Sequence, residues 1–124
     1  MSGRKSNLQI FQTITNGSMA GNLTSAVTNT LLLDNIGYQV DISGTATGTI
    51  TIQVSIDYDQ DNQGNVLNAG HWINLTSASQ AITSGSPTDT YFDILPTSAP
   101  WIRLVYTSTS GTGTMNAFIT GKSV

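Results

Sequence analysis

Two segments of the chain alternate between apolar and polar residues. From Ile36 to Ser43 every second side chain is apolar, and the residues between are polar or glycine. The segment from Thr49 to Asp57 repeats the pattern, with isoleucine or valine at alternate positions. Successive side chains of a strand point to opposite faces of a sheet, so a period of two is typical of a strand with one buried and one solvated face. Both segments are therefore predicted to be half-buried antiparallel strands.

Further short strands are expected along the rest of the chain. They span residues 8–15, 71–75, 90–95, 101–107 and 114–120, with one or two more within residues 18–33. In the first of these segments Leu8, Ile10 and Ile14 share a face, and in the second Ile73 and Leu75 are expected to point inward. The segment 101–107 carries apolar bulk on both faces, so it is predicted to lie at the centre of a sheet.

Turn-forming residues separate these segments. They occur at Asn16-Gly17, at Asp34-Asn35, and within residues 44–48, 84–87 and 110–113. Short strands at this spacing predict an all-β protein, a single antiparallel β-sandwich of about seven to nine strands with jelly-roll or immunoglobulin-like topology. The sandwich domain is assigned to residues 8–124. Residues 1–7 are expected to form a flexible arm, because residues 2–7 contain no apolar side chain.

Charge is scarce in this chain. Only 9% of the 124 residues are charged, against about 25% in an average soluble domain, and there is no glutamate. The net charge of −3 argues against a nucleic-acid partner, which would require a basic stripe. No apolar run is long enough to span a membrane, and no signal peptide is evident, so assembly in the host cytoplasm is expected. Hydrophobic residues make up 38%, so the modest core favours an oligomer.

The sequence offers little for catalysis. Its single histidine, His71, is expected in a strand, and no G-x-S-x-G motif is present to expose a serine nucleophile. Cysteine is absent, which excludes disulfides and thiolate metal sites. We therefore expect a protein that is not an enzyme, with no catalytic residue and no cofactor.

An aspartate-rich segment follows the second alternating strand. Asp57, Asp59 and Asp61 stand at alternate positions, and Asn65 follows, so these four residues form a candidate calcium site. The segment departs from a calcium loop because Asn62 replaces its glycine and Asn68 its final glutamate. The alternative interpretation is a polar hairpin tip between two strands, where aspartate, asparagine and glycine are common.

Three residues are candidates for contact with a partner. Arg4 and Lys5 concentrate half of the four cationic side chains in the N-terminal arm of an otherwise acidic chain. They would dock into an acidic groove on a neighbouring protein. Trp72 is the third candidate, because tryptophan is enriched in binding hot spots. Trp101, by contrast, opens an apolar strand and is expected to pack in the core.

Several segments, in their order along the chain, carry a resemblance to a known group. They are Gly48–Ser55, His71–Leu75, Ala99–Thr107 and Ser110–Thr114. This order resembles small β-sandwich virion proteins of tailed bacteriophages, including capsid decoration (cement) proteins and related head or tail accessory proteins. The resemblance covers about residues 36–122. It implies a structural role on a virus particle and transfers no catalytic residue.

The expected function is that of a capsid decoration protein on the surface of a virion. Such a protein would bind and stabilise the lattice of the major capsid protein of a tailed phage. It would also bind copies of itself as a dimer or trimer that matches a capsid symmetry axis. The alternative is an adhesin or carbohydrate-binding module of the tail or head fibre, with a glycan as its partner.

Overall fold

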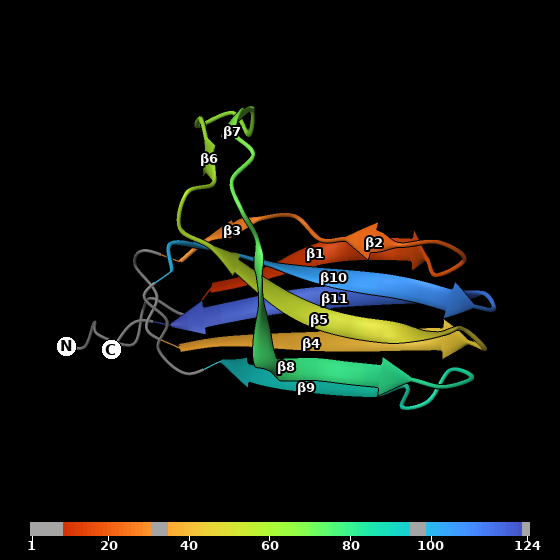
Figure 1. Cartoon of the computed structure of the whole chain (residues 1–124). Coiled ribbons are helices and arrows are strands. Elements are labelled where there is room, and N and C mark those ends of the chain that lie inside the picture. Colours follow the sequence, from red (N-terminus) through yellow and green to blue (C-terminus); the bar gives the residue numbers. More distant parts are fainter. Residues whose placement is uncertain (1–8, 31–34, 95–98, 123–124) are drawn as a thin grey trace.

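The computed structural model describes residues 9–30, 35–94 and 99–122, so the expected arm lies outside the described residues. Two antiparallel sheets pack face to face (Figure 1). One has the order β1 (Gln9–Ser18), β11 (Gly113–Lys122), β4 (Asn35–Gly44) and β9 (Asp89–Ile94). The other has the order β2 (Leu23–Thr24), β10 (Trp101–Ser110), β5 (Thr47–Ser55) and β8 (Ile73–Ile82), and β3 (Thr28–Asn29) also pairs with β10. The predicted all-β sandwich is confirmed. Within these ranges no helix is long and apolar enough to cross a membrane.

The topology is that of a jelly roll. β2 and β3 both pair with β10, so they count as one interrupted edge strand. Along the chain the sandwich strands then alternate between the two sheets at every step except from β5 to β8, and β1 pairs with β11. Eight strands in two Greek keys define a jelly roll, which decides between the two topologies that the sequence left open.

The core lies between the sheets, where the alternating pattern predicts it. In β4 the apolar set is buried, namely Ile36, Tyr38, Val40 and Ile42. Ile50 and Ile52 of β5 face it from the other sheet and are fully buried. The central strands contribute Ile102, Leu104 and Tyr106 from β10 and Met115, Ala117 and Ile119 from β11. Each buried aliphatic side chain stabilises the fold by about 1.5–3 kcal/mol. The prediction that residues 101–107 form a central strand is confirmed.

β1 departs from the predicted alternation because it contains a bulge. Its register with β11 shifts between Gln12 and Ile14. Phe11 and Ile14 lie opposite buried residues of β11, whereas Ile10 is 67% exposed. The prediction that Ile10 and Ile14 share a face is therefore wrong, because the extra residue reverses the phase of the strand. Leu8 lies outside the described residues.

The expected turn at Asn16-Gly17 lies inside β1, where it forms a second irregularity. The φ of Asn16 is 48°, and its backbone N–H donates to Oδ1 of Asn116 at 2.8 Å. A Cβ on Gly17 would lie 2.8 Å from Cγ2 of Ile14 and 3.0 Å from Cδ1 of Leu23. Asparagine tolerates the left-handed backbone and glycine permits the close approach of these side chains. The pair therefore forms an irregularity within β1 and not a turn between two strands.

β5 ends earlier than its pattern predicts. The alternation continues to Ile56, but the strand stops at Ser55 and Ile56 is 80% exposed. The chain leaves the sandwich at this point, so the last apolar residue of the pattern has no opposing sheet to pack against.

β8 also differs from its prediction, since it begins at Ile73 and continues to Ile82. Its second half mixes alanine, serine and glutamine and has one large apolar residue, Ile82, so no apolar alternation indicates a strand there. Ile73 was expected to point inward and is 62% exposed, while Leu75 is half-buried against the core. Ile73 lies opposite Val54 at the end of the sheet, and the register against β5 shifts between Asn74 and Ser79, which changes the phase before the buried Ile82.

Candidate functional site

Between β5 and β8 the chain forms a hairpin that projects from one end of the sandwich (Figure 1). Its strands are β6 (Asp59–Gln60) and β7 (Val66–Asn68). The carboxylate of Asp61 closes the tip: Oδ1 accepts hydrogen bonds from the backbone N–H groups of Gln63 and Asn65, both at 2.9 Å, and Oδ2 accepts one from Nδ2 of Asn65 at 3.1 Å. These bonds, first those from Asn65, lower the pKa of Asp61. The prediction of a polar hairpin tip is confirmed.

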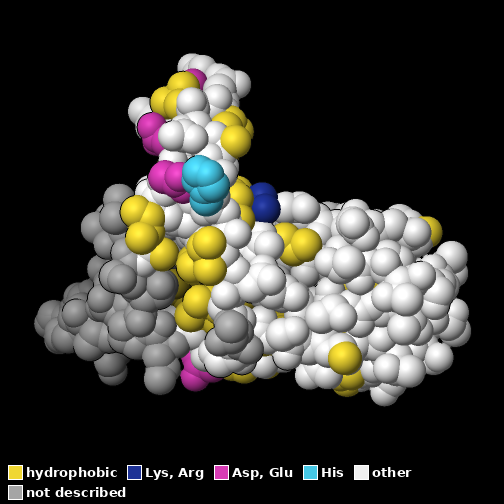
Figure 2. All heavy atoms as spheres, viewed as in Figure 1, with side chains coloured by type: hydrophobic (Ala, Val, Ile, Leu, Met, Phe, Trp, Pro, Cys, Tyr) yellow, Lys and Arg dark blue, Asp and Glu magenta, His cyan; other side chains and the backbone are white. Residues whose placement is uncertain are grey.

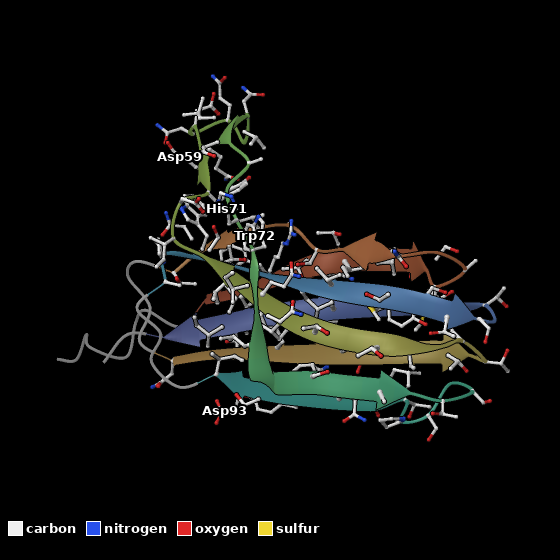
Figure 3. All side chains as sticks on the ribbon, viewed as in Figure 1. Asp59, His71, Trp72 and Asp93 are labelled. Atoms are coloured by element: carbon white, nitrogen blue, oxygen red, sulfur yellow. The ribbon has the colours of Figure 1, made fainter. Side chains whose placement is uncertain are left out.

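The candidate calcium ligands are distributed along this hairpin. Asp61 and Asn65 bond to each other at the tip, and Asp57 lies at the base. Asp59 stands on β6 (Figure 3), and its carboxylate makes no hydrogen bond or ion pair in the described part of the chain. Within that part no group of three or more His, Cys, Asp or Glu side chains is placed to hold a metal ion.

The base of the hairpin is tied by Asp57 and His71. Oδ1 of Asp57 accepts hydrogen bonds from the backbone N–H of His71 at 2.7 Å and from Oγ of Ser55 at 3.0 Å. Oδ2 lies 2.6 Å from Nδ1 of His71. The side-chain bond to His71 is the largest cause that lowers the pKa of Asp57, and the same bond raises the pKa of His71. The pair joins the two limbs where they leave the sheet.

Three aromatic rings form a cluster beneath the hairpin. Tyr58 is 8% exposed, and its ring centroid lies 5.3 Å from that of Trp72 and 5.2 Å from that of Trp101. The hydroxyl of Tyr58 donates to Oε1 of Gln60 at 2.8 Å, and Nε1 of Trp72 donates to the carbonyl of Ala69 at 3.2 Å. Because these rings come from both limbs and from β10, the cluster fixes the hairpin to the sandwich.

Arg103 extends the cluster across the outer face of the five-stranded sheet. Its guanidinium carbon lies 4.2 Å from the centroid of the Trp72 ring. Nε donates to Oε1 of Gln53 at 2.8 Å, and Nε2 of Gln53 donates to Oδ1 of Asn74 at 2.8 Å. Arg103 and Gln53 lie directly opposite each other in the register of β10 and β5, so both side chains rise from one face.

Exposed apolar side chains gather on the hairpin and at its base. They are Ile56, Val66, Leu67 and Ile73, each between 57% and 80% exposed. Figure 2 shows hydrophobic side chains both on the projection and directly beneath it. We call these four residues the apolar hairpin surface. Val66 and Leu67 are neighbours on β7, so their side chains point to its two opposite faces. Elsewhere in the described part of the chain, the large apolar side chains with comparable exposure are Ile10, Phe11 and Tyr91, which lie on the two edge strands of the four-stranded sheet.

A cleft separates the hairpin from the edge of the five-stranded sheet. It has a volume of about 580 Å³ and is open to solvent. Trp101, Pro100 and Asn29 line its sheet side, and residues 59–62 line its hairpin side. An indole, amides and carboxylates therefore meet in one concave surface.

The residues predicted for partner contact have different places in the structure. Trp72 is half-buried at the base of the hairpin (Figure 3) and supports it. Arg4 and Lys5 lie outside the described residues. Sequence reasoning did not single out Arg103 as a partner of Trp72. Arg103 follows Trp101 by two residues, so the sequence could show that both side chains lie on the same face of the strand. It could not show that Trp72 packs there, because Trp72 lies outside any strand and has no pairing register.

The fold is shared with proteins of viral and prophage origin. The SPBc2 prophage-derived protein YomS matches with a TM-score of 0.51 and 12% identity, over 92% of this chain and 93% of that chain. The VP2 subviral particle of infectious bursal disease virus also matches with a TM-score of 0.51 and 12% identity, over 91% of this chain but 32% of that chain. No protein-family model matches the chain, and no curated protein matches it significantly. At these identities the likeness defines the class of fold, a jelly roll, and no more.

Proposed function

We propose that this chain is a non-enzymatic structural protein of a tailed-phage virion, namely a capsid decoration protein that binds the lattice of the major capsid protein. The observation that carries the proposal is the apolar hairpin surface, a set of exposed aliphatic side chains on a rigidly supported projection. Exposed apolar surface of this kind gains free energy when a partner removes it from water.

The support of the hairpin strengthens this proposal. An isolated two-stranded hairpin is at best marginally stable in water. Here the aromatic cluster, the Asp57–His71 pair and the Arg103–Trp72 contact hold it against the sandwich. A preorganised projection loses little conformational entropy when it binds, so more of the contact energy appears as affinity. Trp72 serves the partner contact chiefly by holding this projection in place.

The origin of the proteins with the same fold also supports a virion role. YomS is a prophage-derived protein, and VP2 forms a subviral particle. This agrees with the resemblance of residues 36–122 to small virion proteins of tailed phages. The N-terminal arm, with Arg4 and Lys5, would add a charged anchor to the apolar contact.

Self-association is part of the same proposal. A chain with so few charges has little electrostatic repulsion between copies, and a decoration protein gains from matching a two-fold or three-fold axis of the lattice. A specific contact would bury on the order of 800 Å² on each partner. Light scattering of the pure protein at micromolar concentration is expected to report a dimer or trimer, and a strict monomer contradicts this part of the proposal.

The test is a particle-binding assay with a matched pair of variants. Capsids of the phage that encodes the chain, prepared without it, are mixed with purified protein and sedimented. The double variant Val66→Ser, Leu67→Ser is expected to bind about tenfold more weakly, because it removes apolar area from the contact. The control Ile10→Ser, Tyr91→Ser removes equally exposed apolar groups elsewhere and is expected to bind as the wild type does. Equal binding by both double variants, or no binding of the wild type, contradicts the proposal.

A further inference from the structure

The cleft beside the hairpin has the dimensions of a small-ligand site. Its volume of about 580 Å³ lies within the range of about 300–1,000 Å³ that is typical of such sites. Trp101 of β10 and Asn29 of β3 are directly opposite in register, so both side chains rise from the same sheet face into one wall. Residues 59–62 of the hairpin form the other wall.

The hairpin wall offers both hydrogen-bond acceptors and donors. The carboxylate of Asp59 and the amide of Asn62 have no hydrogen-bond partner in the described part of the chain. Gln60 uses Oε1 to accept from Tyr58, which leaves its NH₂ group to donate. Asp61 already accepts three hydrogen bonds within the turn, so among the described residues that line the cleft Asp59 is the carboxylate that accepts none.

The sheet wall offers an aromatic surface in a fixed orientation. Trp101 is half-buried and packs at 72° to the ring of Tyr58, which holds the indole in place. The part of Trp101 that Tyr58 leaves uncovered lines the cleft next to Pro100. In the described part of the chain the indole N–H makes no hydrogen bond, so it can donate to a ligand.

We propose that this cleft binds a neutral saccharide. A pyranose ring has an apolar face of C–H groups that can lie on Trp101, and hydroxyls that both donate and accept, as the Asp59, Gln60 and Asn62 side chains require. Anionic ligands are disfavoured because, among the described residues, Asp59 and Asp61 line the cleft and no cation does. A lysine ammonium, the rival ligand, has donors alone and would leave the amide NH₂ groups unmatched.

This inference goes beyond capsid attachment and does not depend on it. The apolar hairpin surface lies on β7 and at the strand ends, whereas the cleft uses β6, β3 and the start of β10. The decoration protein of our proposal would therefore present a glycan-binding cleft beside its docking surface.

The experiment is an NMR titration of ¹⁵N-labelled full-length protein with cellohexaose, maltohexaose, chitohexaose and mannohexaose at millimolar concentration. The chain has two tryptophans, so its spectrum contains two indole signals. At least one hexasaccharide is expected to shift the Trp101 signal, while the Trp72 signal, whose Nε1 is bonded to Ala69, stays in place. The substitution Asp59→Ala is expected to weaken the affinity about tenfold, as the loss of a hydrogen bond to a charged group would.

A matched variant separates this effect from a change in charge. Asp93→Ala removes another exposed carboxylate, on β9, and is expected to leave the affinity unchanged (Figure 3). Four results overturn the inference: no shift with any hexasaccharide, a shift of Trp101 with a tri-lysine peptide in place of the saccharides, an affinity that Asp59→Ala leaves unchanged, or equal weakening by Asp93→Ala. None of these results bears on capsid binding by Val66 and Leu67.

Discussion

The guanidinium carbon of Arg103 lies 4.2 Å from the centre of the Trp72 ring and joins an inner strand of the five-stranded sheet to the returning limb of the hairpin. A cation above an indole face is stabilised by the ring quadrupole, by about 0.5–1 kcal/mol at a partly exposed site. The contact places one of the four cations of the chain directly under the projection.

Arg103→Ala is therefore expected to loosen the hairpin more than the sandwich. The predicted loss in the free energy of unfolding is about 1 kcal/mol, because the contact with Trp72 and the bond to Gln53 both disappear. Hydrogen exchange should increase across residues 57–72 and stay slow in β11. Arg103→Lys keeps the charge but not the planar stacking, so it should give an intermediate effect. Uniform exchange changes across both sheets would contradict this account of the support.

A second prediction compares two isoleucines of one alternating pattern. Ile52 is fully buried and Ile56 is 80% exposed. Ile52→Ala is expected to lower the free energy of unfolding by about 2–5 kcal/mol, since it leaves a cavity in the core. Ile56→Ala should change it by less than about 0.5 kcal/mol. Denaturant unfolding measures both, and equal losses would show that β5 continues into the core beyond Ser55.

The same pair shows what the sequence can and cannot predict. Period-two alternation was enough to predict that β4 and β5 are strands and which face of β10 points inward, because burial on one side of a sheet imposes this pattern. It could not reveal where β5 ends, since Ile56 obeys the pattern and lies outside the strand. The bulge before Ile14 was also hidden, because a single extra residue reverses the faces without any change in composition.

The candidate site was harder to predict because it depends on contacts between distant segments. The aspartate-rich hairpin tip is local turn chemistry, and the sequence was sufficient to propose it. The cleft requires Asn29, residues 59–62 and Trp101 to meet, and no local pattern carries that information. The Arg103–Trp72 contact likewise depends on how the returning limb crosses the sheet.

A third prediction concerns pH at the base of the hairpin. The pKa of His71 is raised above 6.5 in the folded chain, so its stabilising contribution is complete below that value and is lost as the pH rises through the folded pKa. The pKa of Asp57 is lowered from 3.8, so its contribution is present above that value and is lost as the pH falls through the folded pKa. The hairpin base should therefore be most stable from about pH 4 to pH 6.5.

An NMR titration of the single histidine measures this directly. In the wild type the imidazole of His71 should titrate above its ordinary pKa, because Asp57 bonds to it and opposes its charge. Asp57→Asn should return the pKa of His71 toward the ordinary value. Identical titration curves for the two proteins would show that the pair does not form in solution.

A fourth prediction follows from the proposed N-terminal anchor. Deletion of residues 2–7 removes Arg4 and Lys5 but no apolar side chain, so the melting temperature of the isolated protein should stay nearly constant. Attachment of the truncated protein to capsids should weaken, and attachment of the full chain should decrease with added salt, because screening reduces charge-assisted contacts. Equal attachment of both proteins at low salt would leave the arm without a role in binding.

A last prediction is that this jelly roll binds a phage capsid through its projecting hairpin. Cryo-electron microscopy of capsids with and without the protein measures this, since the projecting hairpin allows the jelly roll to be oriented in a density map. Added density is expected at regular positions on the outer capsid surface, with β6 and β7 pointing into the lattice. Density confined to the tail, no added density, or a bound orientation with the hairpin facing solvent would contradict it.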